Sequence, residues 1–247
     1  MDIDFQLQPF ETDLLGVPVG RLALPGDDDA ATAGLDSLIV GWRAAGVWLV
    51  SCRVPEGSAA IPALGKRGFR IVETLATFRQ ALHARPMPEG VEFAEIGDAA
   101  ACAAIAGRAF ANDRLHRDPQ VPGAVADRVR ERWVLNDLGG RADACFVVRD
   151  GGQAVGFNLC LLDGQEAVID LIAVDIQRQN KGLGRRLVEA ALAHYGGRVR
   201  TIRVGTQADN APSIALYRGA GFVEGDRRIT LHWVNPNAAP ALKDDSR

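Results

Sequence analysis

The sequence has few residues of the kinds that bind metals, form disulfides or cross membranes. Among its 247 residues are only four cysteines and four histidines, none spaced like the ligands of a zinc site. We therefore expect reduced thiols in the core and no metal. No apolar run approaches the roughly 20 residues of a membrane helix, and the N-terminal Met-Asp-Ile-Asp-Phe lacks the basic-then-apolar order of a secretory signal. These absences predict a cytoplasmic protein that does not contact a membrane.

The chain also lacks an excess of charge of either sign. It contains 31 acidic and 28 basic residues, for a net charge of −3. Because nucleic-acid-binding domains carry a clustered basic surface, we expect no nucleic-acid partner. A content of 47% hydrophobic and 24% charged residues is ordinary for a folded chain, and this length allows one or two domains.

Two folded segments joined by a linker are predicted. Residues 1–83 alternate short strands and helices and form a small α/β N-terminal domain. Residues 84–90 hold two prolines and a glycine, which remove backbone donors and interrupt regular structure, so they form the linker. Residues 91–234 form a second, mixed α/β domain. Residues 235–247 are rich in Pro, Asn, Ala and charge, which is typical of a flexible tail.

The most informative stretch is an apolar strand that leads through a loop into a helix. The strand covers 167–174 and the helix 182–195. Gly182 and Gly184 stand at the start of this helix, where glycine allows a ligand to approach the backbone and the free amides favour an anion. The spacing fits neither a dinucleotide-binding fingerprint nor a Walker loop. We expect a phosphate site, and glycines that serve only helix packing are the alternative.

A second stretch has a comparable order. A strand over 201–206 is followed by a polar loop with Asn210, a short helix over 211–217 that ends in Tyr217, and the turn Gly221-Phe222. Asn210 is placed either to cap this helix or to donate to a ligand.

Taken together, the two stretches resemble motifs A and B of the GNAT N-acetyltransferase superfamily. Motif A reads (Arg/Gln)-x-x-Gly-x-(Gly/Ala), which residues 179–184 fit. Motif B contains Asn, a short helix with Tyr, and Gly-Phe, which Asn210, Tyr217 and residues 221–222 fit. The resemblance covers about 91–234 and implies the GNAT fold, a mixed sheet in which two central strands splay apart.

This resemblance implies an acyl-CoA-dependent N-acetyltransferase with acetyl-CoA as co-substrate, whose pantetheine arm lies in the gap between the splayed strands. The implied contacts to acetyl-CoA come from the end of the first splayed strand, the loop and the two helix starts: Ile172, Ala173, Val174, Gln179, Asn180, Lys181, Gly182, Leu183, Gly184, Arg185 and Asn210.

The implied chemistry needs an acid, a base and a polarising group. Tyr217 matches the general acid of the superfamily, whose phenol protonates the leaving thiolate; packing alone is the alternative. Backbone amides near 172–174 would polarise the thioester carbonyl. Asp170 lies inside an apolar strand, where a carboxylate is costly to bury unless paired. It is therefore a second candidate base that faces the cleft, or one half of a structural ion pair.

Within the superfamily, the whole chain resembles the TDP-fucosamine acetyltransferases, which acetylate the 4-amino group of a TDP-4-amino-4,6-dideoxyhexose. The similar pieces are residues 9–17, 67–73, 110–119 and 201–207. The resemblance assigns the base to Glu73, acting through water, with an exposed strand glutamate as the alternative. The implied partner is a nucleotide-sugar amine, for which the substrate-binding candidates are Asp170, Arg114 and Gln207. Its two phosphates call for arginines, and the expected pool is Arg70, Arg114, Arg117 and Arg132.

Three other interpretations stay open. The acceptor is another amine, such as a protein N-terminus, a polyamine, an aminoglycoside or an amino acid. The chain is a non-catalytic acyl-CoA-binding sensor. Residues 1–83 are a degenerate GNAT half that only supports a homodimer.

Overall fold

The computed structural model describes residues 3–28, 30–110 and 113–240 of the chain. Residue contacts divide the chain into two compact units. Unit 1 consists of residues 1–75, 112–126 and 227–247, and unit 2 of residues 76–111 and 127–226. Two strands, β4 and β10, contain residues of both units, and the irregular segment 84–90 lies within unit 2. The domain boundary expected at that segment stays a prediction.

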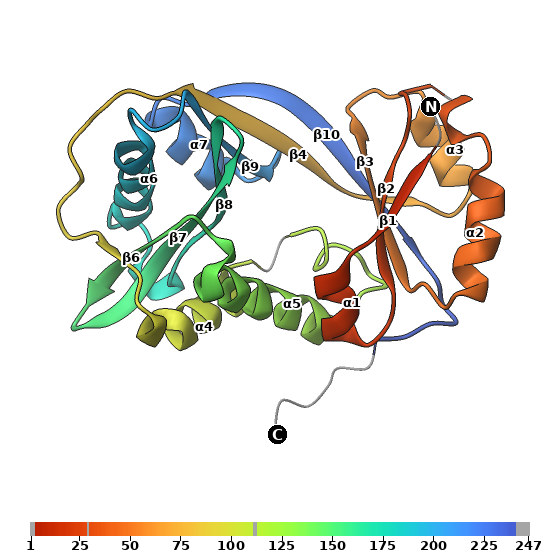
Figure 1. Ribbon diagram of the computed structural model, residues 1–247, viewed down its shortest axis with the longest axis horizontal. Helices are drawn as coiled ribbons and strands as arrows, with labels where there is room; N and C mark the ends of the chain where they lie inside the picture. The colour runs from red at the N-terminus through yellow and green to blue at the C-terminus, as the bar shows by residue number, and fades with distance from the viewer. Residues whose placement is uncertain (1–2, 29, 111–112, 241–247) are drawn as a thin grey trace. The chain divides into compact units, whose positions relative to one another are not determined.

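Unit 1 is built on a sheet with the strand order β1-β2-β3-β10. The pairs β1–β2 and β3–β10 are antiparallel and β2–β3 is parallel. The bounds are β1 (Asp4–Leu7), β2 (Val19–Ala23), β3 (Leu49–Pro55), β10 (Val223–Val234), α1 (Pro9–Leu15), η1 (Ala30–Thr32), α2 (Leu35–Ala44) and α3 (Ala60–Lys66). Helices α2 and α3 lie along one face of this sheet (Figure 1).

The two faces of the unit 1 sheet differ in chemistry. Alternate residues of β3 and β10, such as Cys52 and Leu231, are buried against α2 and α3 in an apolar core. Because side chains alternate along a strand, the residues between them point to the opposite face. These include Ser51, Arg53 and Thr230. One face therefore carries the core and the other carries polar side chains.

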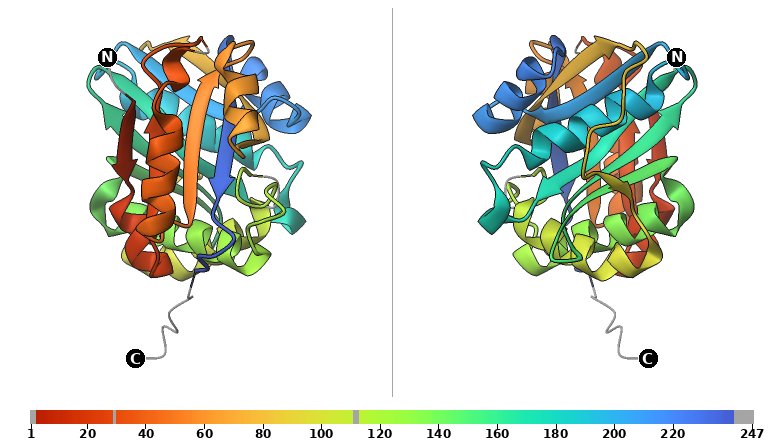
Figure 2. Two further views of the ribbon diagram at one scale, coloured as in Figure 1. Left: turned by 90° about the vertical axis from the view of Figure 1, so that its right-hand side faces the viewer. Right: turned by 90° about the vertical axis from the view of Figure 1, so that its left-hand side faces the viewer.

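Unit 2 is built on a sheet with the strand order β4-β9-β8-β7-β6-β5. The bounds are β4 (Arg70–Ala81), β5 (Glu92–Phe93), β6 (Ala144–Asp150), β7 (Gln153–Asp163), β8 (Glu166–Val174), β9 (Thr201–Gln207), η2 (Ile96–Asp98), α4 (Ala99–Ala109), α5 (Gly123–Asn136), η3 (Asp137–Arg141), η4 (Ile176–Arg178), α6 (Leu183–Tyr195) and α7 (Ala211–Gly219). Two separate apolar clusters, one with α6 and one with α4, cover opposite faces. Figure 2 shows α6 lying across these strands.

A bulge interrupts β8 at Asp170. The register of the β7–β8 pair moves from Leu171 opposite Leu159 to Ile169 opposite Cys160, so Asp170 is an extra residue on β8. An extra residue reverses which side chains of a strand face which side of the sheet. The strand therefore changes its alternation in the middle of the core.

The packing on both sides of β8 follows this reversal. Ala167 and Ile169 belong to the cluster with α6, whereas Leu171 and Ala173 belong to the cluster with α4. The parallel pairing of β8 with β9 also ends at this place, at Ile169 opposite Val204. Beyond it the two strands continue without pairing, so the splayed central strands and the mixed α/β fold expected from the sequence are confirmed.

Residues 9–15 form the short helix α1, with a proline in its first turn. Strand β4 continues to Ala81, and β10 starts at Val223. The four cysteines are free, as expected. Burial raises the thiol pKa of Cys52 and of Cys102 to about 12.

Candidate functional site

The loop after β8 is held by its own side chains. The Asp175 carboxylate accepts a hydrogen bond from the Gln177 amide at 2.9 Å. The Gln179 side-chain amide donates to the Val174 carbonyl at 3.2 Å. Gln179 therefore fixes the shape of the loop, and its contact with the cofactor stays a prediction.

This loop leaves a run of backbone amides available to a ligand. Asn180 and Gly182 both adopt a positive φ, 60° and 76°. In the part of the chain that the structure describes, no backbone or side-chain oxygen accepts from the amides of residues 180–185. Consecutive free amides at a helix start, with the helix dipole, favour a phosphate. We call residues 179–185 the amide loop; it fits the pyrophosphate of acetyl-CoA.

The other cofactor candidates border the amide loop or the splay. Ile172, Ala173 and Val174 form the end of β8, beyond its last pair with β9. Leu183 and Gly184 begin α6. Lys181 is exposed, and the Arg185 guanidinium pairs with the Glu189 carboxylate one turn later at 2.8 Å. Their roles stay predictions.

Asn210 caps a helix. Its side-chain oxygen accepts from the Ser213 amide at 3.3 Å, and its side-chain nitrogen donates to the Thr206 hydroxyl at 3.1 Å. Both ends of the side chain are thus engaged within the protein, which favours the capping alternative. Gln207, the last residue of β9, is partly buried.

Tyr217 lies on α7 with its side chain in the core of unit 2. Its ring is flanked by Phe78 and Phe222, each with a ring centroid 5.9 Å away. Burial raises the pKa of the phenol well above its usual value near 10. Its hydroxyl has no hydrogen-bond partner within the described residues. Tyr195, by contrast, donates to the Asp143 carboxylate at 2.9 Å. The Tyr217 hydroxyl therefore retains a proton that no described residue accepts.

Glu73 is a buried residue of β4 in unit 1. Its carboxylate accepts from the Thr230 hydroxyl at 3.1 Å and lies 3.5 Å from a guanidinium nitrogen of Arg53. Only 5% of the residue is exposed, so the alternative of an exposed strand glutamate is wrong. A buried carboxylate held by a hydroxyl and an arginine is suited to accept a proton or to orient a water.

Asp170, the bulge residue, forms an ion pair. Its carboxylate lies 2.9 Å from the Arg141 guanidinium, which also pairs with Asp137. Asp137 is buried, and desolvation raises its pKa to about 6 against the opposing effect of Arg141. These contacts favour the structural ion pair over a free base at position 170. A substrate contact there stays a prediction.

A charged network that sequence reasoning missed surrounds Arg114 in unit 1. The Arg114 guanidinium lies 3.4 Å from Nε2 of His232, whose Nδ1 lies 3.0 Å from the Asp118 carboxylate. Arg70, from the expected phosphate-binding pool, pairs with Asp118. Desolvation lowers the pKa of the fully buried His232. With Nδ1–H donated to Asp118, Nε2 accepts from Arg114. The polar–apolar alternation of the last strand could have placed His232 on the face opposite the apolar core, but it could not have predicted its burial.

The cofactor candidates and Tyr217 belong to unit 2, and Glu73 and Arg114 belong to unit 1. Arg117 and Arg132, the remaining members of the pool, take part in other interactions. Within the described residues, no group of three His, Cys, Asp or Glu side chains is placed to hold a metal ion. No described helix is long and apolar enough to span a bilayer.

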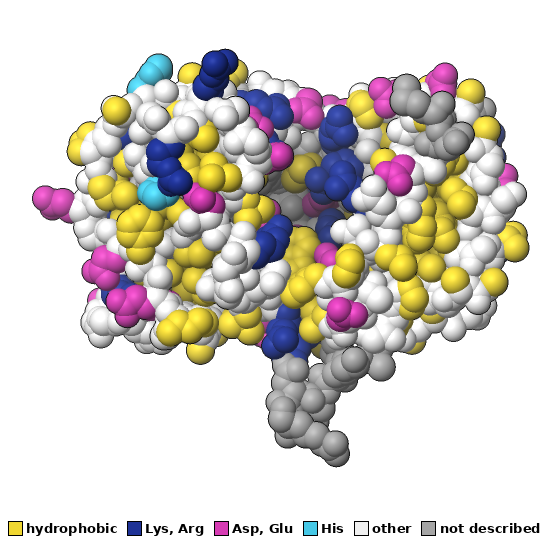
Figure 3. Space-filling model, viewed as in Figure 1, with side chains coloured by type: hydrophobic (Ala, Val, Ile, Leu, Met, Phe, Trp, Pro, Cys, Tyr) yellow, Lys and Arg dark blue, Asp and Glu magenta, His cyan; other side chains and the backbone are white. Residues whose placement is uncertain are grey.

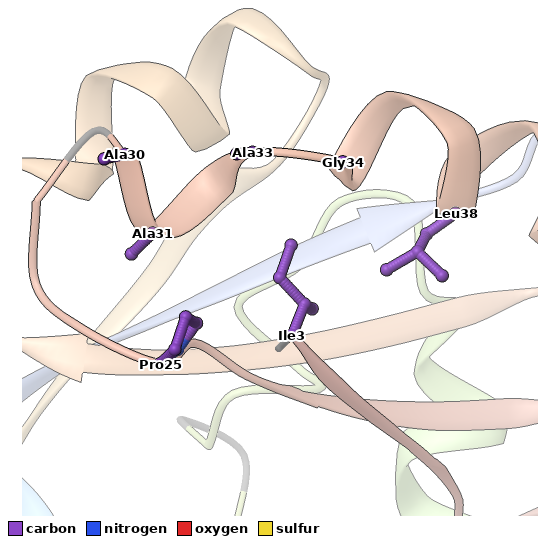
Figure 4. A pocket seen from close by; sticks show the side chains of 7 residues that line it. All are labelled: Ile3, Pro25, Ala30, Ala31, Ala33, Gly34 and Leu38. Atoms are coloured by element: carbon purple, nitrogen blue, oxygen red, sulfur yellow. The ribbon is translucent and has the colours of Figure 1, made fainter. Parts of the chain in front are cut away.

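A shallow pocket in unit 1 is not a candidate site. It has a volume of about 330 Å³ and is lined by small apolar residues and a glycine (Figure 4). The lining residues are Ile3, Pro25, Ala30, Ala31, Ala33, Gly34 and Leu38. Because none of them titrates or carries a side-chain donor, the pocket offers no group for catalysis.

Comparison with curated proteins gives three informative relatives. The chain is 30% identical to the spore coat polysaccharide biosynthesis protein SpsD of Bacillus subtilis over 52% of this chain and 45% of that protein. It is 33% identical to the mycothiol acetyltransferase of Clavibacter michiganensis over 60% of this chain and 48% of that protein. The chain thus spans about half the length of these relatives. It is 36% identical to the [ribosomal protein bS18]-alanine N-acetyltransferase of Escherichia coli over 47% of this chain and 72% of that protein.

The fold comparison agrees with these matches. A crystal structure of a GCN5-related N-acetyltransferase from Sphaerobacter thermophilus superposes with a TM-score of 0.63 and 19% identity, over 98% of this chain and 79% of that one. The model of the acetyltransferase (GNAT) family matches residues 110–222, which include the amide loop and Tyr217. The splayed strands, the amide loop and these matches agree, and the chain belongs to the GNAT acetyltransferase family.

Proposed function

We propose that this chain is an acetyl-CoA-dependent N-acetyltransferase whose acceptor is the 4-amino group of a TDP-linked 4-amino-4,6-dideoxyhexose. The observation that carries the first half is the parting of β8 and β9 beyond Ile169 and Val204, directly before the amide loop. Free strand edges beside free helix-start amides suit a long ligand that ends in a pyrophosphate. Acetyl-CoA is the acetyl donor of the family and supplies the thioester.

The chain's own residues supply the remaining chemistry. As the amine nitrogen bonds to the acetyl carbon and the carbon–sulfur bond breaks, charge develops on the carbonyl oxygen. Backbone amides at 172–174 are our candidates for stabilising that oxygen. Tyr217 gives its proton to the leaving sulfur, which its raised pKa and free hydroxyl support. Glu73 takes the amine proton through water.

The choice of an amino-sugar acceptor rests on a resemblance and on the name of one relative. The chain resembles the TDP-fucosamine acetyltransferases in both halves, and one relative is named for polysaccharide biosynthesis. Two other relatives carry different names, mycothiol acetyltransferase and ribosomal-protein-alanine N-acetyltransferase. The test must therefore include amines of each class.

The experiment measures thiol release from acetyl-CoA with purified full-length protein. The amines are TDP-4-amino-4,6-dideoxy sugars, a UDP analogue, spermidine, kanamycin and an alanine-started peptide. Release with the TDP sugars alone supports the proposal. Release with another amine keeps the acetyltransferase and rejects the sugar acceptor. Acetyl-CoA binding without turnover of any amine supports the sensor interpretation.

A further inference from the structure

Three neighbouring strands of unit 1 place Arg53, Thr230 and Glu73 in one row. Strand β10 lies between β3 and β4 in the sheet. Arg53 of β3 is directly opposite Thr230 of β10, and Thr230 contacts Glu73 of β4 on its other side. Side chains that are opposite each other on neighbouring strands point to the same face of the sheet. The row thus brings together side chains from three separate parts of the sequence.

The hydrogen bonds along this row have a fixed direction. The Arg53 Nε–H donates to the Thr230 hydroxyl oxygen at 3.1 Å. A guanidinium cannot accept a hydrogen bond, and a hydroxyl has a single proton to donate. The Thr230 proton is therefore directed to Oε1 of Glu73, which lies at 3.1 Å. We call the contacts from Arg53 through Thr230 to Glu73 the donor chain.

The donor chain ends on a buried carboxylate. Only 1% of Thr230 and 5% of Glu73 are exposed, so water competes little for the contact between them. Arg53 also approaches Glu73 directly, with Nη2 3.5 Å from Oε1. Burial disfavours the charged form of a carboxylate, whereas hydrogen bonds to its oxygens favour that form. The two donors near Oε1 therefore compensate Glu73 for lost water and keep the carboxylate able to accept a proton.

Other charged and titratable groups approach the donor chain from several elements. They are Arg21 of β2, Arg114 of the segment before α5, Arg228 and His232 of β10, Asp118 beside His232, and Arg70 beside Asp118. Partial burial lowers the pKa of Arg53, and Glu73 opposes this effect. Several Lys and Arg side chains also lie close together on the surface shown in Figure 3. Glu73 and Arg53 thus stabilise each other's charge.

We propose that Thr230 and Arg53 are positioning residues for the proton acceptor Glu73. The Arg53 guanidinium orients the Thr230 hydroxyl, and this hydroxyl holds the Glu73 carboxylate in its charged form. The inference rests on the proposed function, in which Glu73 takes the amine proton through water. Thr230 keeps its own proton throughout, so it acts on the reaction only through Glu73.

The variants separate the Thr230 hydroxyl from the shape of its side chain. Thr230→Val keeps a branched side chain that suits a strand and removes the hydroxyl, whereas Thr230→Ser keeps the hydroxyl. Arg53→Lys keeps the charge and removes the Nε donor. The matched control is Thr201→Val in unit 2, because the Thr201 hydroxyl also donates to a strand carboxylate, that of Glu166, at 3.3 Å.

The first measurement follows the side-chain carboxyl carbon of Glu73 by nuclear magnetic resonance as the pH changes. It uses the full chain with isotope-labelled glutamate and no substrate, and Glu73→Gln identifies the signal. We expect Thr230→Val to raise the midpoint of this titration by about one pH unit, because the lost hydrogen bond favours the charged form. Arg53→Lys should shift it in the same direction, whereas Thr230→Ser and Thr201→Val should leave it in place.

The second measurement is the pH dependence of kcat/KM for thiol release with acetyl-CoA and a TDP-4-amino-4,6-dideoxy sugar. Glu73→Gln should lower kcat about 10²–10⁴-fold. Thr230→Val should lower it about tenfold and move the acid limb of the profile to higher pH, with the KM for acetyl-CoA unchanged. Thr230→Ser should retain most of the activity. A merely structural role of Thr230 would lower the melting temperature and leave the acid limb in place.

An unchanged Glu73 midpoint in Thr230→Val overturns the inference, whatever the rates. If Thr230→Val does not fold, an unchanged midpoint in Arg53→Lys has the same meaning. A shifted midpoint together with full activity of Glu73→Gln rejects Glu73 as the base, and the inference falls with it. A shifted midpoint without acetylation of any TDP sugar supports the donor chain and rejects the proposed acceptor.

Discussion

At the scale of single residues, the two tyrosines of this chain differ in one property. Both rings are buried, but the Tyr195 hydroxyl donates to Asp143, whereas Tyr217 has no described partner. A buried phenol without a partner retains its proton and is free to give it to a ligand atom. The partner of the hydroxyl, and not the burial of the ring, distinguishes a structural from a reactive tyrosine here.

We expect Tyr217→Phe to lower kcat by about 10²–10⁴-fold, the usual contribution of a general acid, while the KM for acetyl-CoA stays nearly constant. Tyr195→Phe is the matched control: it should keep kcat and lose about 1 kcal/mol of stability with its hydrogen bond. Steady-state kinetics and urea unfolding measure both effects. Equal kcat values for Tyr217→Phe and the unmodified chain would leave Tyr217 with packing alone.

The buried Asp137 should give the stability a pH dependence of unusual sign. Its pKa is about 6 in the folded chain, against an ordinary 3.8. Between these values the folded chain keeps a proton that the unfolded chain releases, so the free energy of unfolding falls as the pH rises from about 4 to 6. The full difference corresponds to at most about 3 kcal/mol.

Asp137→Asn removes this titration. The free energy of unfolding of the variant minus that of the unmodified chain should therefore be larger at pH 7 than at pH 4.5. Urea unfolding followed by circular dichroism at the two pH values measures the difference between the two proteins. If that difference is the same at both pH values, Asp137 titrates normally in the folded state.

At the scale of elements, the amide loop depends on backbone and not on side chains. A Cβ added at Gly184 would meet its nearest atom, Cδ2 of Leu216, at 3.5 Å, an ordinary contact. The position therefore accepts a short side chain. A carboxylate there would add a negative charge in the first turn of α6, which suits the helix dipole but opposes a bound phosphate.

We expect Gly184→Asp to melt at or above the temperature of the unmodified chain and to bind acetyl-CoA at least about tenfold more weakly. Gly184→Asn has nearly the same shape without the charge and should lose less affinity. Calorimetric titration with acetyl-CoA gives both dissociation constants. If both variants lost the same affinity for acetyl-CoA, the size of the side chain and not its charge would explain the loss. The electrostatic role of the loop would then be rejected.

The elements also separate what the sequence could predict from what it could not. The amide loop, Asn210 and Tyr217 were expected from local spacing, and they lie on the β8–α6 and β9–α7 segments. The bulge at Asp170 could not be predicted, because alternation in an apolar strand does not reveal an extra residue. Its ion pair with Arg141 joins positions 29 residues apart.

At the scale of the whole molecule, local sequence patterns could not predict contacts between residues that are distant in the sequence. Nothing in the alternation of Arg53 or Thr230 shows that β3 and β10 are neighbours, although 177 residues separate these two side chains. The contact between Arg53 and Thr230 therefore emerges only from the fold. The same holds for β4, whose second half belongs to the core of unit 2.

This connectivity makes a prediction about a fragment of residues 84–247, which contains the expected linker, second domain and tail. A fragment with these ends lacks Ala76, Phe78 and Leu82, which belong to the main core of unit 2. Phe78 is fully buried beside Tyr217. Loss of a buried phenylalanine side chain alone costs about 3–5 kcal/mol, against a total stability of about 5–15 kcal/mol for a typical domain. Removing the whole strand also leaves the edge of β9 unpaired.

We therefore expect the fragment 84–247 to show no cooperative thermal unfolding and no near-ultraviolet circular dichroism of a packed core. A fragment of residues 70–247 retains β4 and should unfold cooperatively, with a midpoint below that of the full chain, because the β10 side chains lose α2 and α3. Cooperative unfolding of 84–247 together with acetyl-CoA binding would contradict this expectation. It would also place the domain boundary at residues 84–90, so the comparison of the two fragments decides which residues the acetyltransferase unit needs.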